Sequence, residues 1–330
     1  MRRRALLEFA AAALAAPTSL LAQQQRRVHR IGLLGISAPT PEVLNLTLVP
    51  FRQRLRELGW IENQDIVIEQ RWAQGESARY PELAAELVRL KVDVIVAVTS
   101  EAVLGVQQAT RTVPIVGTFL SDPVNLGLIQ SYARPGRQVT GLTSEVGGLP
   151  ISAKTLEFLK LAVPTASRVA VLVNVKAKLA DHLLNDIEQA AKALKVGIVP
   201  VEAETPDQLE PAFARMLQGG AQALYILADA MFFAHRTRIA ELAIRHRLPM
   251  GTAMAQYAQA GSLINYVADV SDIYRRAAGY VDKILRGANP AELPIEQPTR
   301  FQLVVNLKTA KLLGLTVPQT VLLRADRVIE

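Results

Sequence analysis

Candidate ligand-binding side chains follow the apolar segments of this chain. Short runs of apolar, β-branched residues recur along the sequence, and hydroxyl, amide or carboxyl groups come directly after them. Hydroxyls and amides can bind polar ligands through hydrogen bonds, and a carboxylate can balance the charge of an ammonium group. Phe119, Phe232 and Tyr257 could pack against the apolar part of such a ligand. The residues that we expect to contact a ligand are Ser37, Thr99, Ser100, Glu101, Asp122, Asn174, Asp229, Tyr257 and Asn265.

Each of these residues also has a purely structural interpretation. Ser100 and Asp229 are residue types that commonly cap helices, and Asp122 before Pro123 is a common turn pair. If Ser100 caps a helix that begins at Glu101, the first amides of that helix stay free and could bind a carboxylate. The set as a whole favours binding, because polar residues recur at the same place in both halves of the sequence.

The sequence lacks the patterns that usually mark catalytic, metal and cofactor sites. It contains no GxGxxG dinucleotide pattern, no GxxxxGK[ST] phosphate loop and no GxSxG nucleophile turn. The four histidines show no metal-ligand spacing. The absence of cysteine excludes disulfides, thiolate metal sites and thiol nucleophiles. We therefore expect no catalytic residue, no metal and no cofactor.

The elements that must position these side chains are strands alternating with helices. The run VDVIVAV at 92–98 is apolar enough for a strand buried on both faces of a sheet. Alternation of this kind predicts parallel sheets covered by helices, and ligands bind such sheets at the carboxyl ends of the strands. The predicted strands span 28–36, 65–72, 92–98, 113–118, 168–174, 196–203, 222–227 and 248–252, and the segment 261–266 follows the last of them. The predicted helices span 44–58, 80–90, 101–110, 151–162, 178–195, 206–218 and 231–246.

The order of strand and helix restarts near the middle of the chain. Residues 134–150, RPGRQVTGLTSEVGGLP, are rich in glycine, proline and polar residues, as is typical of a crossover between domains. The pattern therefore predicts two similar α/β lobes rather than one large sheet, and it does not give the order of strands within each sheet. A strongly amphipathic helix predicted at 273–285 could return to the first lobe.

The N-terminal residues 1–23 have the composition of an export signal. Arg2, Arg3 and Arg4 precede an alanine- and leucine-rich run at 5–16, and small Ala22 follows near the end. The run is shorter than the ~20 residues that span a bilayer. The paired arginines fit the twin-arginine route, and a general secretory signal with one additional arginine fits equally well. Both predict a mature protein in the periplasm.

The charge distribution argues against a nucleic-acid partner. The formal charge of +7 falls to +5 once the three arginines and one glutamate of residues 1–23 are removed. The remaining charges are interspersed and form no long basic run.

The C-terminal part of the sequence resembles a known family. Residues 294–315, PIEQPTRFQLVVNLKTAKLLGL, are similar to the ending of ABC-transporter substrate-binding proteins, in the group that includes tryptophan- and tyrosine-binding members. The resemblance continues in SDPVNLGLIQSYARPGRQVTGLT at 121–143, in RRAAGYVDKILRGANPAELP at 275–294 and in the tail 324–330. It implies a periplasmic-binding-protein type I fold, with two Rossmann-like lobes, three crossings and a ligand cleft between the lobes. On that fold the first lobe comprises residues 27–143 plus about 267–293, and the second comprises 144–266 plus about 294–330.

Two departures from the family pattern bear on the ligand. The loop after the third strand often has a small residue followed by Pro-Ala in this family, whereas here it is Thr99-Ser100-Glu101-Ala102. The usual ARPGGN also appears as ARPGRQ at 133–138. An added carboxylate at the cleft favours a cationic or amino group in the ligand.

The resemblance implies a periplasmic receptor that captures a small molecule by hinge closure and delivers it to an inner-membrane permease and ATPase. We expect the ligand to be an amino acid or a related small carboxylate, and the protein to be a monomer. One alternative is a ligand-binding sensor. Another is the effector core of a transcription regulator, although such cores follow a helix-turn-helix and this chain's first strand begins at Val28. A cleft enzyme with an acidic pair is a third, and turnover of a bound ligand would favour it.

Overall fold

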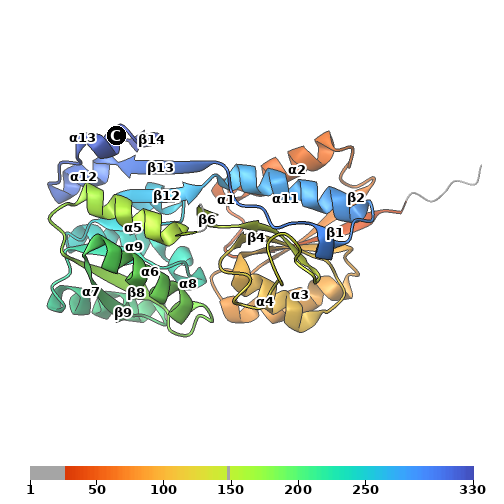
Figure 1. The fold of residues 1–330 in the computed structure, drawn as a ribbon, viewed down its shortest axis with the longest axis horizontal. Helices are drawn as coiled ribbons and strands as arrows, with labels where there is room; N and C mark the ends of the chain where they lie inside the picture. Colours follow the sequence, from red (N-terminus) through yellow and green to blue (C-terminus); the bar gives the residue numbers. More distant parts are fainter. Residues whose placement is uncertain (1–26, 147–148) are drawn as a thin grey trace, which may run out of the picture.

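The protein folds into two α/β lobes that lie side by side (Figure 1). A computed structural model describes residues 27–146 and 149–330, so the predicted export signal at 1–23 lies outside the described residues. Each lobe is built around its own sheet with helices on both faces. This architecture confirms the predicted fold class.

The first lobe is built on a five-stranded parallel sheet in the order β2-β1-β3-β4-β5. Its strands are β1 (His29–Gly35), β2 (Ile66–Trp72), β3 (Val94–Val98), β4 (Ile115–Leu120) and β5 (Val139–Thr143). Every residue of β3 is buried, because helices cover both faces of the sheet. One face packs against α2 (Leu48–Glu57) and α11 (Val270–Leu285), and the other packs against α3 (Tyr80–Arg89) and α4 (Thr99–Ala109).

The second lobe is built on a seven-stranded sheet in the order β14-β13-β12-β11-β10-β8-β9, in which only the pairing of β12 with β13 is antiparallel among the described residues. The strands are β8 (Arg168–Val173), β9 (Gly197–Glu202), β10 (Ala223–Ile226), β11 (Met250–Thr252), β12 (Ile264–Ala268), β13 (Phe301–Asn306) and β14 (Arg327–Ile329). One core contains α5 (Ile151–Ala162), α6 (Ala180–Leu194), α12 (Leu307–Leu313) and α13 (Gln319–Leu322). The other contains α7 (Leu209–Gln218), α8 (Ala230–Ala234), α9 (Arg236–Arg245) and α10 (Tyr257–Ala260).

The two sheets share one strand order. In the second sheet, β9-β8-β10-β11-β12 repeats the arrangement β2-β1-β3-β4-β5 of the first. In both, the first strand of the lobe lies between its second and third strands. Successive connections therefore leave that position in opposite directions, which creates a crevice at the carboxyl ends of the strands.

The chain passes between the lobes at three places. The segment between β5 and α5 enters the second lobe, and Asp269 links β12 to α11, which packs on α2 of the first lobe. After the 3₁₀ turn η3 (Pro290–Glu292), the chain returns to β13. On its way Glu296 pairs with Gly141 and Thr143 of β5 through backbone hydrogen bonds. This pairing ties the third passage to the edge of the first sheet.

Two predicted helices are interrupted. The helix predicted at 44–58 breaks at Thr47 into α1 (Pro41–Leu46) and α2, since Pro50 lacks the amide that would bond the preceding turn. The helix predicted at 231–246 breaks at His235 into α8 and α9. β5, β13 and β14 are additional strands that the sequence analysis did not assign. Within the described residues, no helix has both the length and the apolar character needed to cross a membrane.

Candidate functional site

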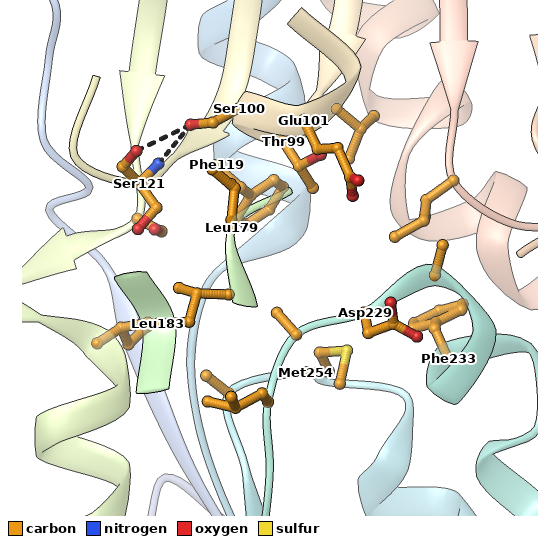
Figure 2. A pocket seen from close by; sticks show the side chains of 18 of the residues that line it. Thr99, Ser100, Glu101, Phe119, Ser121, Leu179, Leu183, Asp229, Phe233 and Met254 are labelled. Atoms are coloured by element: carbon orange, nitrogen blue, oxygen red, sulfur yellow. Dashed lines mark hydrogen bonds between the residues drawn. The ribbon is translucent and has the colours of Figure 1, made fainter. Parts of the chain in front are cut away.

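A cavity of about 220 Å³ lies between the two lobes (Figure 2). Loops after β1, β3 and β4 line it from the first lobe, and loops after β8, β10 and β11 line it from the second. These loops follow the carboxyl ends of parallel strands. They include the two strands on either side of each crevice, β1 and β3 in the first lobe and β8 and β10 in the second. The cavity therefore occupies the place where open α/β sheets bind ligands.

Six of the predicted ligand contacts line this cavity and three do not. The lining residues are Ser37, Thr99, Ser100, Glu101, Asn174 and Asp229, and Phe119 also lines the cavity. The residues that lie elsewhere are Asp122, Tyr257 and Asn265.

The residues outside the cavity have structural partners that explain their position. The Tyr257 hydroxyl is fully buried and donates to the carbonyl of Phe232 at 2.6 Å. The Asn265 side chain is fully buried and donates to the carbonyl of Met254 at 2.9 Å. Asp122 points to His182 of the second lobe, with 3.5 Å between Oδ2 and Nε2. Tyr257 and Asn265 therefore bond within the second lobe, and Asp122 faces the second lobe from the first.

Ser100 connects two strand ends instead of capping a helix. Its buried hydroxyl donates to the Ser121 carbonyl and accepts from the Ser121 amide, both at 2.9 Å (Figure 2). α4 begins at Thr99, and the Thr99 hydroxyl accepts from the Ala102 amide at 3.4 Å. Thr99 also has φ of +76°, a strained conformation for a β-branched residue. Strain of this kind concentrates at functional sites, and here it lies at the cavity wall.

Two carboxyl groups face the cavity from opposite lobes, Glu101 in α4 and Asp229 before α8; we call them the cleft carboxyls. Figure 2 shows them on opposite sides of the cavity. Asp229 is 5% exposed, accepts from the Phe232 amide at 2.9 Å and accepts from the Asn174 side chain at 3.1 Å. Asp229 thus caps α8 and borders the cavity at once.

Burial shifts the titration of both cleft carboxyls. Loss of solvent raises the pKa of Glu101, and hydrogen bonds from the Lys178 amide and the Ser77 side chain oppose this shift in part. Burial likewise raises the pKa of Asp229 against its hydrogen bonds. The negative charge of Asp229 further raises the pKa of Glu101, so the two groups repel each other across the cavity.

Most of the remaining cavity wall is apolar and was not identified from the sequence. Leu179, Leu183, Phe233 and Met254 line it from the second lobe, and Trp72 lines it from the first. Phe232, which we expected near a ligand, instead packs in the second-lobe core. A run such as AMFFA does not reveal which of two adjacent rings faces outward, because that depends on where the helix begins.

The lobes touch each other around the cavity. The Glu101 carboxylate accepts from the Lys178 amide at 3.4 Å, and 3.7 Å separates Glu42 Oε2 from Arg236 Nη2. A Cβ added at Gly75 of the first lobe would lie 2.7 Å from the Cβ of Ala234 in α8. The structure therefore shows the cavity with its two walls in contact at the rim.

The described residues contain no group of three or more histidine and acidic side chains that could hold a metal ion. The histidine and carboxylates at the rim, His182, Asp122 and Asp186, form interactions of 3.5 and 3.7 Å that are ion pairs when the imidazole is protonated.

Known proteins share the sequence pattern and the architecture of this chain. The model of the family "ABC transporter substrate binding protein" matches residues 43–329. A tyrosine-binding protein from Clostridioides difficile is 23% identical over 265 residues, which cover 80% of this chain and 75% of that protein. A conserved domain protein from Vibrio cholerae is 24% identical, with a TM-score of 0.83 over 92% of this chain and all of the other. An ABC domain in complex with L-Trp from Streptococcus pneumonia is 20% identical, with a TM-score of 0.82 and the same coverage.

These findings agree with the resemblance in the sequence. The family match spans both lobes, and the solved structures have the same fold. Members of the family bind solutes and are not enzymes, in line with the sequence expectation. The chain belongs to the ABC transporter substrate-binding protein family and has the periplasmic-binding-protein type I fold.

Proposed function

We propose that this protein is the periplasmic receptor of an ABC import system and captures an amino acid or a closely related small molecule. The observation that carries this proposal is the shared cavity, to which both lobes contribute polar and apolar side chains. The named ligands of its relatives, tyrosine and L-Trp, support an amino acid.

The proposed mechanism is hinge closure. A ligand that first binds one lobe gains contacts with the other lobe when the passages between them bend. Because those additional contacts exist only in the closed state, the ligand shifts the equilibrium toward closure. The contacts that link Glu101 to Lys178 and Asp122 to His182 are the expected rim of the closed state.

We assign ligand contacts to Ser37, Thr99, Glu101, Asn174 and Asp229, with Ser100 holding the loops that present them. The apolar residues Phe119, Leu179, Leu183, Phe233 and Met254 would surround the body of the ligand. A mixed wall of this kind fits an amino acid with an apolar side chain.

A ligand screen tests the binding function. The mature protein, purified without refolding, is heated with single amino acids, short peptides, nucleosides, sugars and organic acids. At a hundredfold excess over its dissociation constant, a ligand stabilises the native state by about 2.7 kcal/mol. Stabilisation by an amino acid supports the proposal, and no response in any of the classes refutes it.

Cell fractionation and crosslinking test the transport role. We expect the mature protein in the periplasmic fraction, and we expect crosslinks to a permease that increase when the ligand is present. Crosslinking to a sensor kinase instead would favour the sensor alternative, and retention in the cytoplasm would favour a regulator.

A further inference from the structure

We propose that the ligand is an organic amine, whose ammonium group is held between Glu101 of the first lobe and Asp229 of the second, and that a ligand carboxylate contributes little. This inference rests on the proposed function, because it specifies the ligand of the same cavity. It specifies which group of the ligand is recognised: the ammonium group is required for binding, and the carboxylate is dispensable.

The charges that line the cavity are all negative. Glu101 and Asp229 line it, and no lysine, arginine or histidine does so among the described residues. A ligand carboxylate would enter a largely apolar space that already contains two acidic side chains, with no cationic side chain to compensate it. An ammonium group would instead compensate both cleft carboxyls.

The two carboxyls come from opposite lobes, so closure brings them toward each other. Burial raises the pKa of each group, and the negative charge of Asp229 further raises the pKa of Glu101, so the closed cavity disfavours two negative charges. A cation between them removes this penalty only when the lobes close. Its charge therefore supplies the difference in affinity between open and closed states that closure requires.

Two helix starts at the cavity, those of α4 and α8, already carry acidic groups. Glu101 lies in the first turn of α4, and Asp229 accepts from the Phe232 amide at the start of α8. Carboxylates placed there compensate the positive ends of these helices and repel a further anion. α5 begins with no side-chain cap. Its Ser152 is 7% exposed and lines the cavity, and the Ser152 hydroxyl has no partner in the structure. Because this hydroxyl is free and lies at a helix start without an acidic group, it is the position where a ligand carboxylate would bind best.

Lys178 is a cationic residue that acts on Glu101 from outside the cavity lining. Its exposed side chain lowers the pKa of Glu101, but this effect is smaller than the opposite effect of burial. Lys178 also donates its backbone amide to Glu101 across the rim. Glu101 therefore has a closure role besides charge recognition, and the experiment must separate the two.

Matched ligands provide the first arm of the experiment. Isothermal titration calorimetry compares an amino acid with the amine and the acid of the same skeleton: phenylalanine, phenethylamine and 3-phenylpropionate, then leucine, isopentylamine and 4-methylpentanoate. We expect the amine to bind within about threefold of the amino acid or tighter, and the acid to bind at least tenfold more weakly than the amine, a difference of about 1.4 kcal/mol per tenfold.

Charge-removing variants provide the second arm. Glu101→Gln and Asp229→Asn should each weaken the amine about 30-fold, since removal of one partner from a buried charge pair costs at least that factor. Ser152→Ala should leave amine binding unchanged. Glu210→Gln, at an exposed position of α7, controls for loss of charge elsewhere. A neutral ligand of the screen separates charge recognition from closure: a closure contact alone would weaken neutral and charged ligands equally, whereas charge recognition weakens only the amine.

The outcomes distinguish this inference from the proposed function. An amino acid that binds more than tenfold tighter than its amine, with the excess lost in Ser152→Ala, would overturn the amine inference and leave the receptor function intact. Equal weakening of neutral and charged ligands by Glu101→Gln and Asp229→Asn would also overturn it. Silence of the complete screen would refute the receptor function itself.

Discussion

Gly75 lies where the two lobes meet, and we expect a single methyl group added there to hold the cavity open. Gly75 has φ of +88° and lies in the loop after β2, against α8 of the other lobe. A Cβ at this position would lie 2.7 Å from the Cβ of Ala234 and 3.0 Å from the carbonyl oxygen of Ala230. Normal contacts between such atoms are about 3.5–4.0 Å. The lobes of Gly75→Ala must therefore stay about 1 Å further apart at this point or deform.

The size of the effect follows from the cost of overpacking. Forcing an additional methyl group into a packed contact costs about 1–3 kcal/mol. Under the proposed hinge closure this cost applies only in the closed state, so it should weaken ligand binding by about 5- to 150-fold. Titration calorimetry with the ligand that gives the largest thermal shift measures the loss. Small-angle scattering of the liganded protein should show a larger radius of gyration than that of the wild type.

Gly59→Ala is the matched control. Gly59 also has a positive φ, of +94°, but an added Cβ would meet no atom within 4 Å. Both variants should lose about 1–2 kcal/mol of stability because alanine is strained at positive φ. Only Gly75→Ala should lose affinity. If Gly75→Ala binds ligand as tightly as Gly59→Ala, the interpretation of this contact as part of closure is refuted.

Three further predictions concern the rim and the cavity. Asp122→Asn removes the charge that faces His182 across the lobes, with 3.5 Å between Oδ2 and Nε2. It should weaken ligand binding by about two- to fivefold, because a solvent-accessible pair of this kind contributes at most ~1 kcal/mol. Titration calorimetry at pH 6 measures the loss, and unchanged affinity would contradict the rim assignment. Ser100→Ala removes two hydrogen bonds to the backbone of Ser121 and should cost about 1–2 kcal/mol in urea unfolding, so a smaller loss would show that the bonds are replaced. Burial raises the pKa of each cleft carboxyl in the folded state, so the ligand-free native state binds more protons than the unfolded chain between the ordinary and the raised values. Urea unfolding should therefore show the protein gaining stability, relative to a variant with amides at both positions, as the pH falls from 7 through that window, and a parallel pH dependence in the two proteins would argue against the shifts.

Local sequence was sufficient to predict the alternation of strands and helices. A strand buried on both faces must be apolar along its whole length, as in β3, and the helices that cover it show apolar residues at helical spacing. Helix breaks were harder to place. The interruption at Thr47 depends on Pro50 three residues later, and the interruption at His235 has no comparable marker in the sequence.

The candidate site was partly predictable for the same reason. Residues directly after β1, β3, β8 and β10 must emerge at the carboxyl edge of a sheet, so the strand ends identified Ser37, Glu101, Asn174 and Asp229 without coordinates. Tyr257 and Asn265 were expected at the cavity because they lie near a predicted crossing between the lobes, but their side chains turn inward to bond backbone carbonyls. The direction of a side chain depends on packing against neighbours that are distant in the sequence.

The sequence by itself determined the fold class, the family and the polar residues at strand ends, because these depend on local periodicity and on motifs. Only the tertiary structure decided the strand order, the choice of Phe233 over Phe232 at the cavity, and the contact of Asp122 with His182. It also decided that Glu101 and Asp229, 128 positions apart, face one cavity from opposite lobes. The physical reason is that these features depend on the relative placement of whole lobes, which is set by packing and by the passages between the lobes, and no short segment encodes it.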